Sequence, residues 1–212
     1  MERQIASSLL SIGAVFLRPE QPFTWASGIK SPIYCDNRLT LSFPAVREQI
    51  ENGLASLVRQ YFPEARMLMG TSTAGIAHAA ITATLLGLPM GYVRSEAKSH
   101  GRTNRIEGKM EPGTKIVVIE DLISTGGSAI EVVEALREEG AEVLGIVSIF
   151  TYGMKRGLDR IAAAQTVNHS LCCLDTLVEV AEEEGYIAPG WKERILAFRD
   201  NPSDESWIRN HE

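Results

Sequence analysis

The sequence has few of the features that mark secreted, membrane or nucleic-acid-binding proteins. Its three cysteines are an odd number without metal-ligand spacing, which argues against a secreted disulfide framework. It has no run of about 18 apolar residues and no signal-peptide pattern, so we expect no membrane span and no secretion. Lysine and arginine total 21 against 27 aspartate and glutamate residues, and the net charge of −6 predicts no general attraction to nucleic acid or anionic membrane. These absences favour a cytoplasmic protein.

The length of 212 residues, with 44% hydrophobic and 23% charged residues, is typical of one globular domain. Buried-strand patterns alternate with helical patterns, which predicts an α/β fold with a central, mostly parallel sheet flanked by helices. We expect a single domain over residues 1–212. Its N-terminal part, about residues 1–40, would hold a helix over residues 2–17 and a small β hood, and about residues 41–200 would form the α/β core.

Residues 115–129, KIVVIEDLISTGGSA, combine a buried strand, a turn of small residues and the start of a helix. The strand ends in the carboxylates of Glu120 and Asp121. Ligands of open α/β sheets lie outside the carboxyl ends of strands, and free N–H groups at a helix start bind anions. The pattern therefore favours a phosphorylated sugar over a plain tight connection. Because no lysine follows the glycines, the turn is not a Walker motif.

Three other segments suit such a ligand, although each has a purely structural alternative. Residues 70–75, GTSTAG, are a second anion-binding turn or an ordinary tight turn. Residues 94–110 carry six basic side chains against two acids and are a lid over a polyphosphate or a solvated loop. Residues 22–38 are a hydrophobic packing element or a hood over a planar ring, with Lys30 and Arg38 near an anionic group. His78 and His169 have no partner by spacing, and we interpret both as structural.

Three of these segments together resemble a known family. VVIEDLISTGGSA is similar to the phosphoribosyl pyrophosphate motif of type I phosphoribosyltransferases, and FTWASGIKSPIYCDNR and YVRSEAKSHG resemble the orotate phosphoribosyltransferases in particular. The match runs in order from about residue 10 to residue 200. It implies the type I phosphoribosyltransferase fold and a glycosyltransferase of de novo pyrimidine biosynthesis. Such an enzyme transfers ribose 5-phosphate from 5-phosphoribosyl 1-pyrophosphate to orotate, giving orotidine 5′-monophosphate and pyrophosphate.

The resemblance also implies roles for individual residues. Glu120 and Asp121 would contact the ribose hydroxyls, and Arg94, Lys98 and His100 would bind pyrophosphate from a lid supplied across a homodimer interface. Lys98, His100 and Asp121 are the expected catalytic residues. Mg²⁺ carried by the pyrophosphate is the implied cofactor, without metal ligands from the protein. The 5-phosphate would be enclosed by a run in which Ser124 also reaches orotate: Leu122, Ile123, Ser124, Thr125, Gly126, Gly127 and Ser128.

The chain departs from the family at several cationic positions. Well-known members have lysine where this chain has Ala26, Ala74 and Ser95. They also place an orotate-binding arginine just after the strand that ends here near residue 150, where this chain reads TYGMKR. Our hypothesis is that Arg38 or Lys30 binds the orotate carboxylate instead.

Two other functions remain as alternatives. The first is a phosphoribosyltransferase for adenine, xanthine or uracil, against which the SGIKSPIY stretch favours the orotate branch. The second is a non-catalytic regulator that senses phosphoribosyl pyrophosphate and binds nucleic acid. The net charge of −6 and the lack of an appended helix-turn-helix pattern argue against it.

Overall fold

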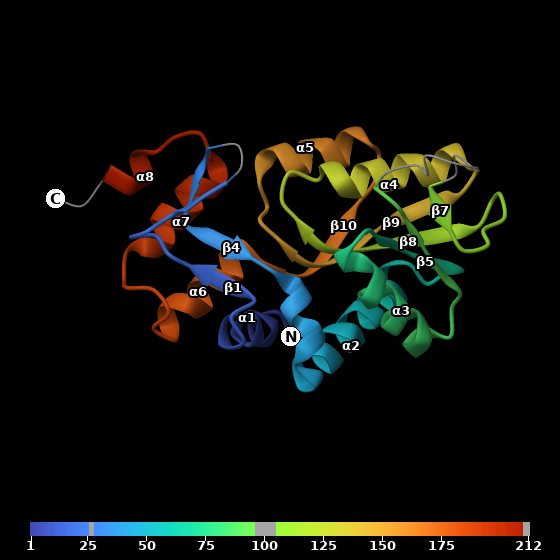
Figure 1. Ribbon diagram of the computed structural model, residues 1–212, viewed down its shortest axis with the longest axis horizontal. Coiled ribbons are helices and arrows are strands. Elements are labelled where there is room, and N and C mark those ends of the chain that lie inside the picture. The colour runs from blue at the N-terminus through green and yellow to red at the C-terminus, as the bar shows by residue number, and fades with distance from the viewer. Residues whose placement is uncertain (26–27, 96–104, 210–212) are drawn as a thin grey trace.

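The computed structural model describes residues 1–25, 28–95 and 105–209, in which a central six-stranded sheet has helices on both faces (Figure 1). The strand order is β10-β9-β8-β5-β6-β7. The first five strands are parallel and β7 is antiparallel to β6, as the sequence pattern predicted for a mostly parallel sheet. The strands are β5 (Met67–Thr71), β6 (Met90–Val93), β7 (Ile106–Glu107), β8 (Lys115–Ile123), β9 (Glu142–Thr151) and β10 (Asn168–Cys173).

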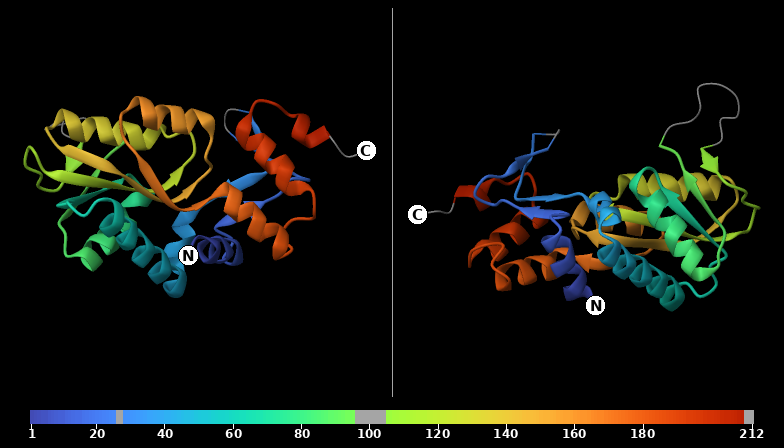
Figure 2. Two further views of the ribbon diagram at one scale, coloured as in Figure 1. Left: turned by 180° about the vertical axis from the view of Figure 1, so that it is seen from behind. Right: turned by 60° about the horizontal axis from the view of Figure 1, so that its bottom comes forward.

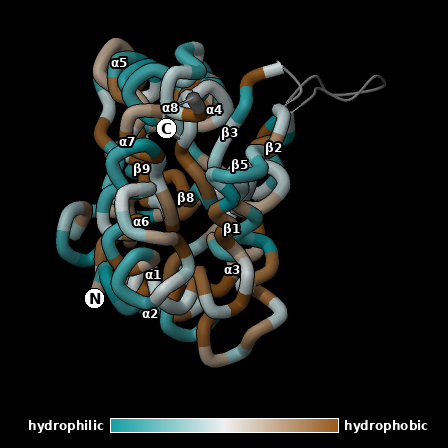
Figure 3. The backbone as a smooth tube through the Cα atoms, turned by 90° about the vertical axis from the view of Figure 1, so that its left-hand side faces the viewer, coloured by the Kyte–Doolittle hydropathy of each residue, from teal (hydrophilic) through white to brown (hydrophobic). Residues whose placement is uncertain are grey.

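Strand β8 is apolar on both faces because a layer of helices covers each one. Val117 and Ile119 belong to the core cluster shared with α2 (Pro44–Tyr61) and α3 (Ala74–Leu86). Ile116 and its neighbour Val118 pack instead with α4 (Gly127–Glu138) and α5 (Lys155–Ala163). Hydrophobic segments of β8 and β9 accordingly run through the interior in Figure 3.

The N-terminal region differs from its sequence pattern. The predicted helix over residues 2–17 is shorter, because α1 (Glu2–Ser11) ends before Gly13, which has a φ of 69°. Residues 15–17 form strand β1 (Val15–Leu17), and Phe16 is 41% exposed there instead of lying on a buried helical stripe. The apolar spacing was real, but a glycine in the left-handed region separates its two halves.

The predicted β hood is present in the described residues and packs against the end of the chain. Strand β1 pairs with β4 (Ile33–Cys35), and β2 (Phe23–Thr24) pairs with β3 (Lys30–Ser31). The 3-10 helix η1 (Asn37–Ser42) follows β4. Figure 2 shows these segments beside the C-terminal helices α6 (Leu174–Glu183), α7 (Trp191–Asp200) and α8 (Ser206–Arg209). The Trp25 ring meets Phe198 edge-on, with centroids 5.7 Å apart.

No helix in the described ranges is long and apolar enough to cross a membrane.

Candidate active site

Two strand-to-helix turns lie at the same edge of the sheet. Strands β5 and β8 are paired in parallel, with Gly70 opposite Ile119, so the turns that follow them emerge next to each other. A Cβ on Gly75 would come within 2.5 Å of the Ile119 carbonyl oxygen, and one on Gly70 within 2.8 Å of the Gly75 carbonyl oxygen. The start of α3 therefore packs so closely on the sheet that only glycine fits at these positions.

The two carboxylates of β8 have different environments, because successive side chains of a strand point to opposite faces. Glu120 is buried, with 5% of its surface exposed, whereas Asp121 is half-buried. The pKa of Glu120 is raised to about 8, chiefly by burial and also by a hydrogen bond with Asp121 and by the negative charge of that neighbour. The Glu120 carboxyl group therefore carries its proton at pH 7 and can donate a hydrogen bond.

The hood is attached directly to this acidic pair. The side chain of Asn37 is fully buried, and its amide nitrogen donates a hydrogen bond of 2.7 Å to the backbone carbonyl of Asp121. Strand β8 runs through both acids to Ile123, so they lie inside the end of the strand and not beyond it. The hood and the carboxyl end of β8 thus form one continuous wall.

The turn between β8 and α4 leaves backbone N–H groups available to an anion. Gly126, the residue before the helix, has a φ of 73°, and the first N–H groups of α4 have no acceptor within their own helix. Helix α5 supports the turn from behind. A Cβ on Gly157 would come within 2.5 Å of the Ser124 carbonyl oxygen, and Arg160 donates a hydrogen bond of 3.1 Å to the Thr125 carbonyl.

The other residues predicted for the phosphate turn differ in accessibility. The side chains of Leu122, Ser124 and Thr125 are partly accessible, and Ser128 is exposed. Ile123 is 3% exposed and belongs to the core on the α4 face. Its carbonyl accepts a hydrogen bond of 2.9 Å from the backbone N–H of Tyr152, so its backbone and side chain both serve the packing of the strand end.

The cations predicted from the sequence are distributed over three places. Arg94 follows β6 next to the second turn, where its Nη1 lies 3.8 Å from Glu107 Oε1. Arg38 is paired with Asp36, with 2.7 Å between Nε and Oδ1, and Lys30 donates to the Thr24 hydroxyl at 2.7 Å. The remaining predicted residues, Lys98 and His100, lie outside the described residues, as does the departure at Ala26.

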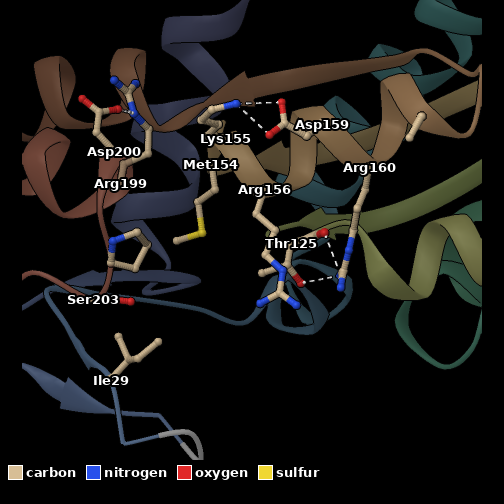
Figure 4. A pocket seen from close by; sticks show the side chains of 12 residues that line it. Ile29, Thr125, Met154, Lys155, Arg156, Asp159, Arg160, Arg199, Asp200 and Ser203 are labelled. Atoms are coloured by element: carbon tan, nitrogen blue, oxygen red, sulfur yellow. Dashed lines mark hydrogen bonds and ion pairs between the residues drawn. The ribbon is translucent and has the colours of Figure 1, made fainter.

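A pocket of about 600 Å³ opens between the phosphate turn, the hood and the C-terminal helices (Figure 4). Most of its lining was not predicted from the sequence, although the TYGMKR segment, where the chain departs from the family, forms part of it. Among its lining residues are Ile29, Thr125, Met154, Arg156, Arg199 and Ser203.

The fold and the paired turns define the class of protein. Residues 42–175 match the phosphoribosyl transferase domain family, to which the chain therefore belongs. It is 59% identical over 208 residues to the orotate phosphoribosyltransferase of Bacillus cytotoxicus. This alignment covers 98% of this chain and 99% of that protein. Within the family, the chain belongs with the orotate phosphoribosyltransferases.

Solved structures agree with this placement. The orotate phosphoribosyltransferase of Aeropyrum pernix is similar with a TM-score of 0.74 and 28% identity, over 87% of this chain and 99% of that one. The UMP synthase of Leishmania donovani has a TM-score of 0.80 and 26% identity, over 93% of this chain. The match spans 42% of that longer chain.

Proposed function

We propose that this protein transfers ribose 5-phosphate from 5-phosphoribosyl 1-pyrophosphate to a ring nitrogen of orotate, giving orotidine 5′-monophosphate and pyrophosphate for pyrimidine biosynthesis. The observation that carries the proposal is the placement of two close-packed, glycine-containing turns at one sheet edge, under a hood and beside two acids, of which Glu120 is buried and Asp121 half-buried. Such an edge can hold a sugar between two phosphate groups. The relatives named above supply the identity of the base.

In this proposal the turn between β8 and α4 holds the sugar phosphate. Residues 122–128 enclose the 5-phosphate through their N–H groups, and Ser124 also reaches orotate. Asp121 accepts hydrogen bonds from ribose hydroxyls, while Glu120, which keeps its proton at pH 7, donates one. A charged Asp121 also tolerates the positive charge that develops on the sugar in an oxocarbenium-like transition state.

The leaving diphosphate requires cations that this turn does not provide. Arg94, Lys98 and His100 are the proposed source, and Lys98 and His100 are the proposed catalytic residues with Asp121. The described residues contain no group of three or more His, Cys, Asp or Glu that could hold a metal ion. Mg²⁺ is commonly held by substrate phosphates, water and few carboxylates, and in this proposal it arrives with the diphosphate and neutralises part of its charge.

The wider features of the proposal follow the same family pattern. We expect a homodimer whose lid is shared between subunits, with neither nucleic acid nor membrane as a partner. A single domain is supported by the core cluster, which joins Ile5 of α1, Ile33 of the hood and Phe198 of α7 to the sheet. A cytoplasmic location agrees with the free thiols of the three cysteines.

An assay with a panel of bases tests the proposal. The protein is incubated with phosphoribosyl pyrophosphate, Mg²⁺ and one of orotate, uracil, adenine or xanthine, and pyrophosphate release is measured. We expect release with orotate only. Release with another base, or none with any base, would contradict the assignment.

A further inference from the structure

A hydrogen bond from Asn37 joins the hood to the carboxyl end of strand β8. Asn37 is the first residue of η1, the 3-10 helix that connects β4 of the hood to α2. Its side-chain nitrogen Nδ2 donates to the backbone carbonyl of Asp121 over 2.7 Å. The two residues are 84 positions apart in the sequence, so this bond connects segments that the chain alone keeps far apart.

Asn37 points to the sheet edge, whereas its two neighbours pair with each other toward the outside. The Oδ1 atom of Asp36 lies 2.7 Å from Nε of Arg38, whose side chain is 63% exposed. The side chain of Asn37, between them, is fully buried. The backbone N–H of Asp36 donates to the Ala14 carbonyl at 2.7 Å, directly before β1, so the start of η1 is held on the hood. Asn37 therefore moves with the hood.

The backbone of Asp121 is held by side chains on both of its peptide groups. Its N–H donates a hydrogen bond of 2.8 Å to Oε1 of Glu120, and its carbonyl accepts the bond from Asn37. Because the direction of a side chain depends on the orientation of its own backbone, these two bonds determine where the Asp121 carboxylate points. Asn37 can thus act on this carboxylate without touching a substrate.

Packing alone does not explain an asparagine at position 37. Its Oδ1 atom is buried and has no hydrogen-bond partner within the part of the chain that the structure describes. Such an acceptor costs free energy that an apolar side chain of similar size avoids. The nearby Cys35 is a weak competitor for the amide nitrogen, because burial raises the pKa of its thiol and a neutral thiol accepts hydrogen bonds poorly. The bond to Asp121 is therefore the main interaction that this amide supplies.

We propose that Asn37 is a positioning residue that aligns the Asp121 carboxylate with the ribose and ties this alignment to the hood, an inference that rests on the proposed function. The carboxylate then faces the positive charge that develops on the sugar as the bond to the diphosphate breaks. This charge exists only in the transition state, so a misaligned carboxylate lowers turnover more than substrate affinity. The 5-phosphate keeps its own backbone donors in the turn before α4.

Two variants that remove the donor test the proposal. Asn37→Leu keeps most of the side-chain volume and has no unsatisfied oxygen, so it carries the test even if Asn37→Ala fails to fold. Pyrophosphate release with orotate should show kcat lowered about 10- to 100-fold, which corresponds to about 1.4 to 2.7 kcal/mol of transition-state stabilisation. KM for phosphoribosyl pyrophosphate should stay within about threefold of the wild-type value, because the phosphate donors are unchanged.

A double-mutant cycle shows whether Asn37 acts through Asp121. In the background of Asp121→Asn, the carboxylate to be aligned is absent, so adding Asn37→Leu should lower kcat by less than about threefold. A merely structural role would instead multiply the two effects. If Asn37→Leu lowers kcat by the same factor in both backgrounds, the inference is wrong.

Ser31→Ala is the matched control inside the hood. Ser31 is also fully buried, but its hydroxyl donates to the Ile33 carbonyl at 2.8 Å, within the hood. This variant should keep kcat within about threefold of the wild type. An equal fall of kcat in Ser31→Ala and Asn37→Leu would mean that any loosening of the hood has the same effect, and the role given to Asn37 would be lost.

The remaining outcomes separate this inference from the proposed function. If the wild type forms orotidine 5′-monophosphate and Asn37→Leu turns over equally fast, the inference fails and the proposed function stands. A rise in KM without a fall in kcat has the same meaning, because the bond then serves substrate affinity. A wild type that releases no pyrophosphate with orotate would refute the proposed function, and the inference with it.

Discussion

Replacing Glu120 by glutamine should remove much of the pH dependence of the free energy of unfolding. Burial raises the pKa of this carboxyl group from 4.5 to about 8 in the folded protein. Between these two values the folded state binds a proton that the unfolded state releases, so wild-type stability falls as pH rises through this range. Glutamine has nearly the same shape and is neutral in both states.

The structure sets the size of the effect. One pH unit within this window corresponds to about 1.4 kcal/mol, so a pKa that moves from 4.5 to about 8 limits the total loss to about 5 kcal/mol. The stability of Glu120→Gln minus that of the wild type should therefore increase steadily from pH 4.5 to pH 8. The increase should level off above the folded-state pKa.

Urea unfolding at half-unit pH steps, followed by tryptophan fluorescence and circular dichroism, measures this difference. Glu134→Gln removes an exposed carboxylate of α4 and serves as the control, since its curve should run parallel to that of the wild type. Parallel curves for Glu120→Gln and the wild type across the whole window would refute the argument, because a carboxyl group that ionises normally in the folded state produces no such divergence.

Three further substitutions test the lid, the turn after β8 and the buried pair between α2 and α3. Lys98→Ala should lower turnover by about 10- to 1000-fold in steady-state assays, because the proposed role of this cation is to neutralise the charge of the leaving diphosphate; wild-type turnover would exclude that role. Gly157→Ala should destabilise the protein by about 1 to 3 kcal/mol and raise KM for phosphoribosyl pyrophosphate, since its methyl group collides with the Ser124 carbonyl. An unchanged KM would show that the turn can move away. Glu51→Ala should lower the free energy of unfolding by about 1 to 3 kcal/mol in urea unfolding, because it leaves the fully buried His78 without its hydrogen-bond partner. A loss below this range would mean that the histidine finds another partner.

Much of the fold could be predicted because local chemistry determines it. The apolar segment over residues 90–93 forms strand β6, and the helix α4 stops before Gly140, which has a φ of 85°. A parallel strand that is buried on both faces needs an almost continuous run of apolar, mostly β-branched residues, and such a run is easy to recognise in a sequence. The position of the site could be predicted for a related reason. The turns of small residues directly follow buried parallel strands, so they must lie at the edge of the sheet where the carboxyl ends of those strands meet.

Contacts between segments that are far apart in the sequence could not be predicted from the spacing of residues. His78 has no partner nearby in sequence, yet its Nδ1 lies 2.6 Å from Glu51 Oε1 on α2, and Thr82 donates to the same carboxyl group. His169 likewise stacks on Tyr61, with ring centroids 3.6 Å apart. Arg156 was visible as a basic residue, but only the packing of α5 on the phosphate turn places it in the pocket.

The contact between the hood and the end of the chain constrains when the protein becomes functional during its synthesis. The ring of Trp25 in the hood packs edge-on against that of Phe198 in α7, with centroids 5.7 Å apart. A ribosome adds residues in order, so the hood must wait for α7 to emerge before it can close over the sheet edge. A messenger truncated before residue 191 would therefore yield a chain that has both strand-to-helix turns but lacks the helix α7 that supports the hood.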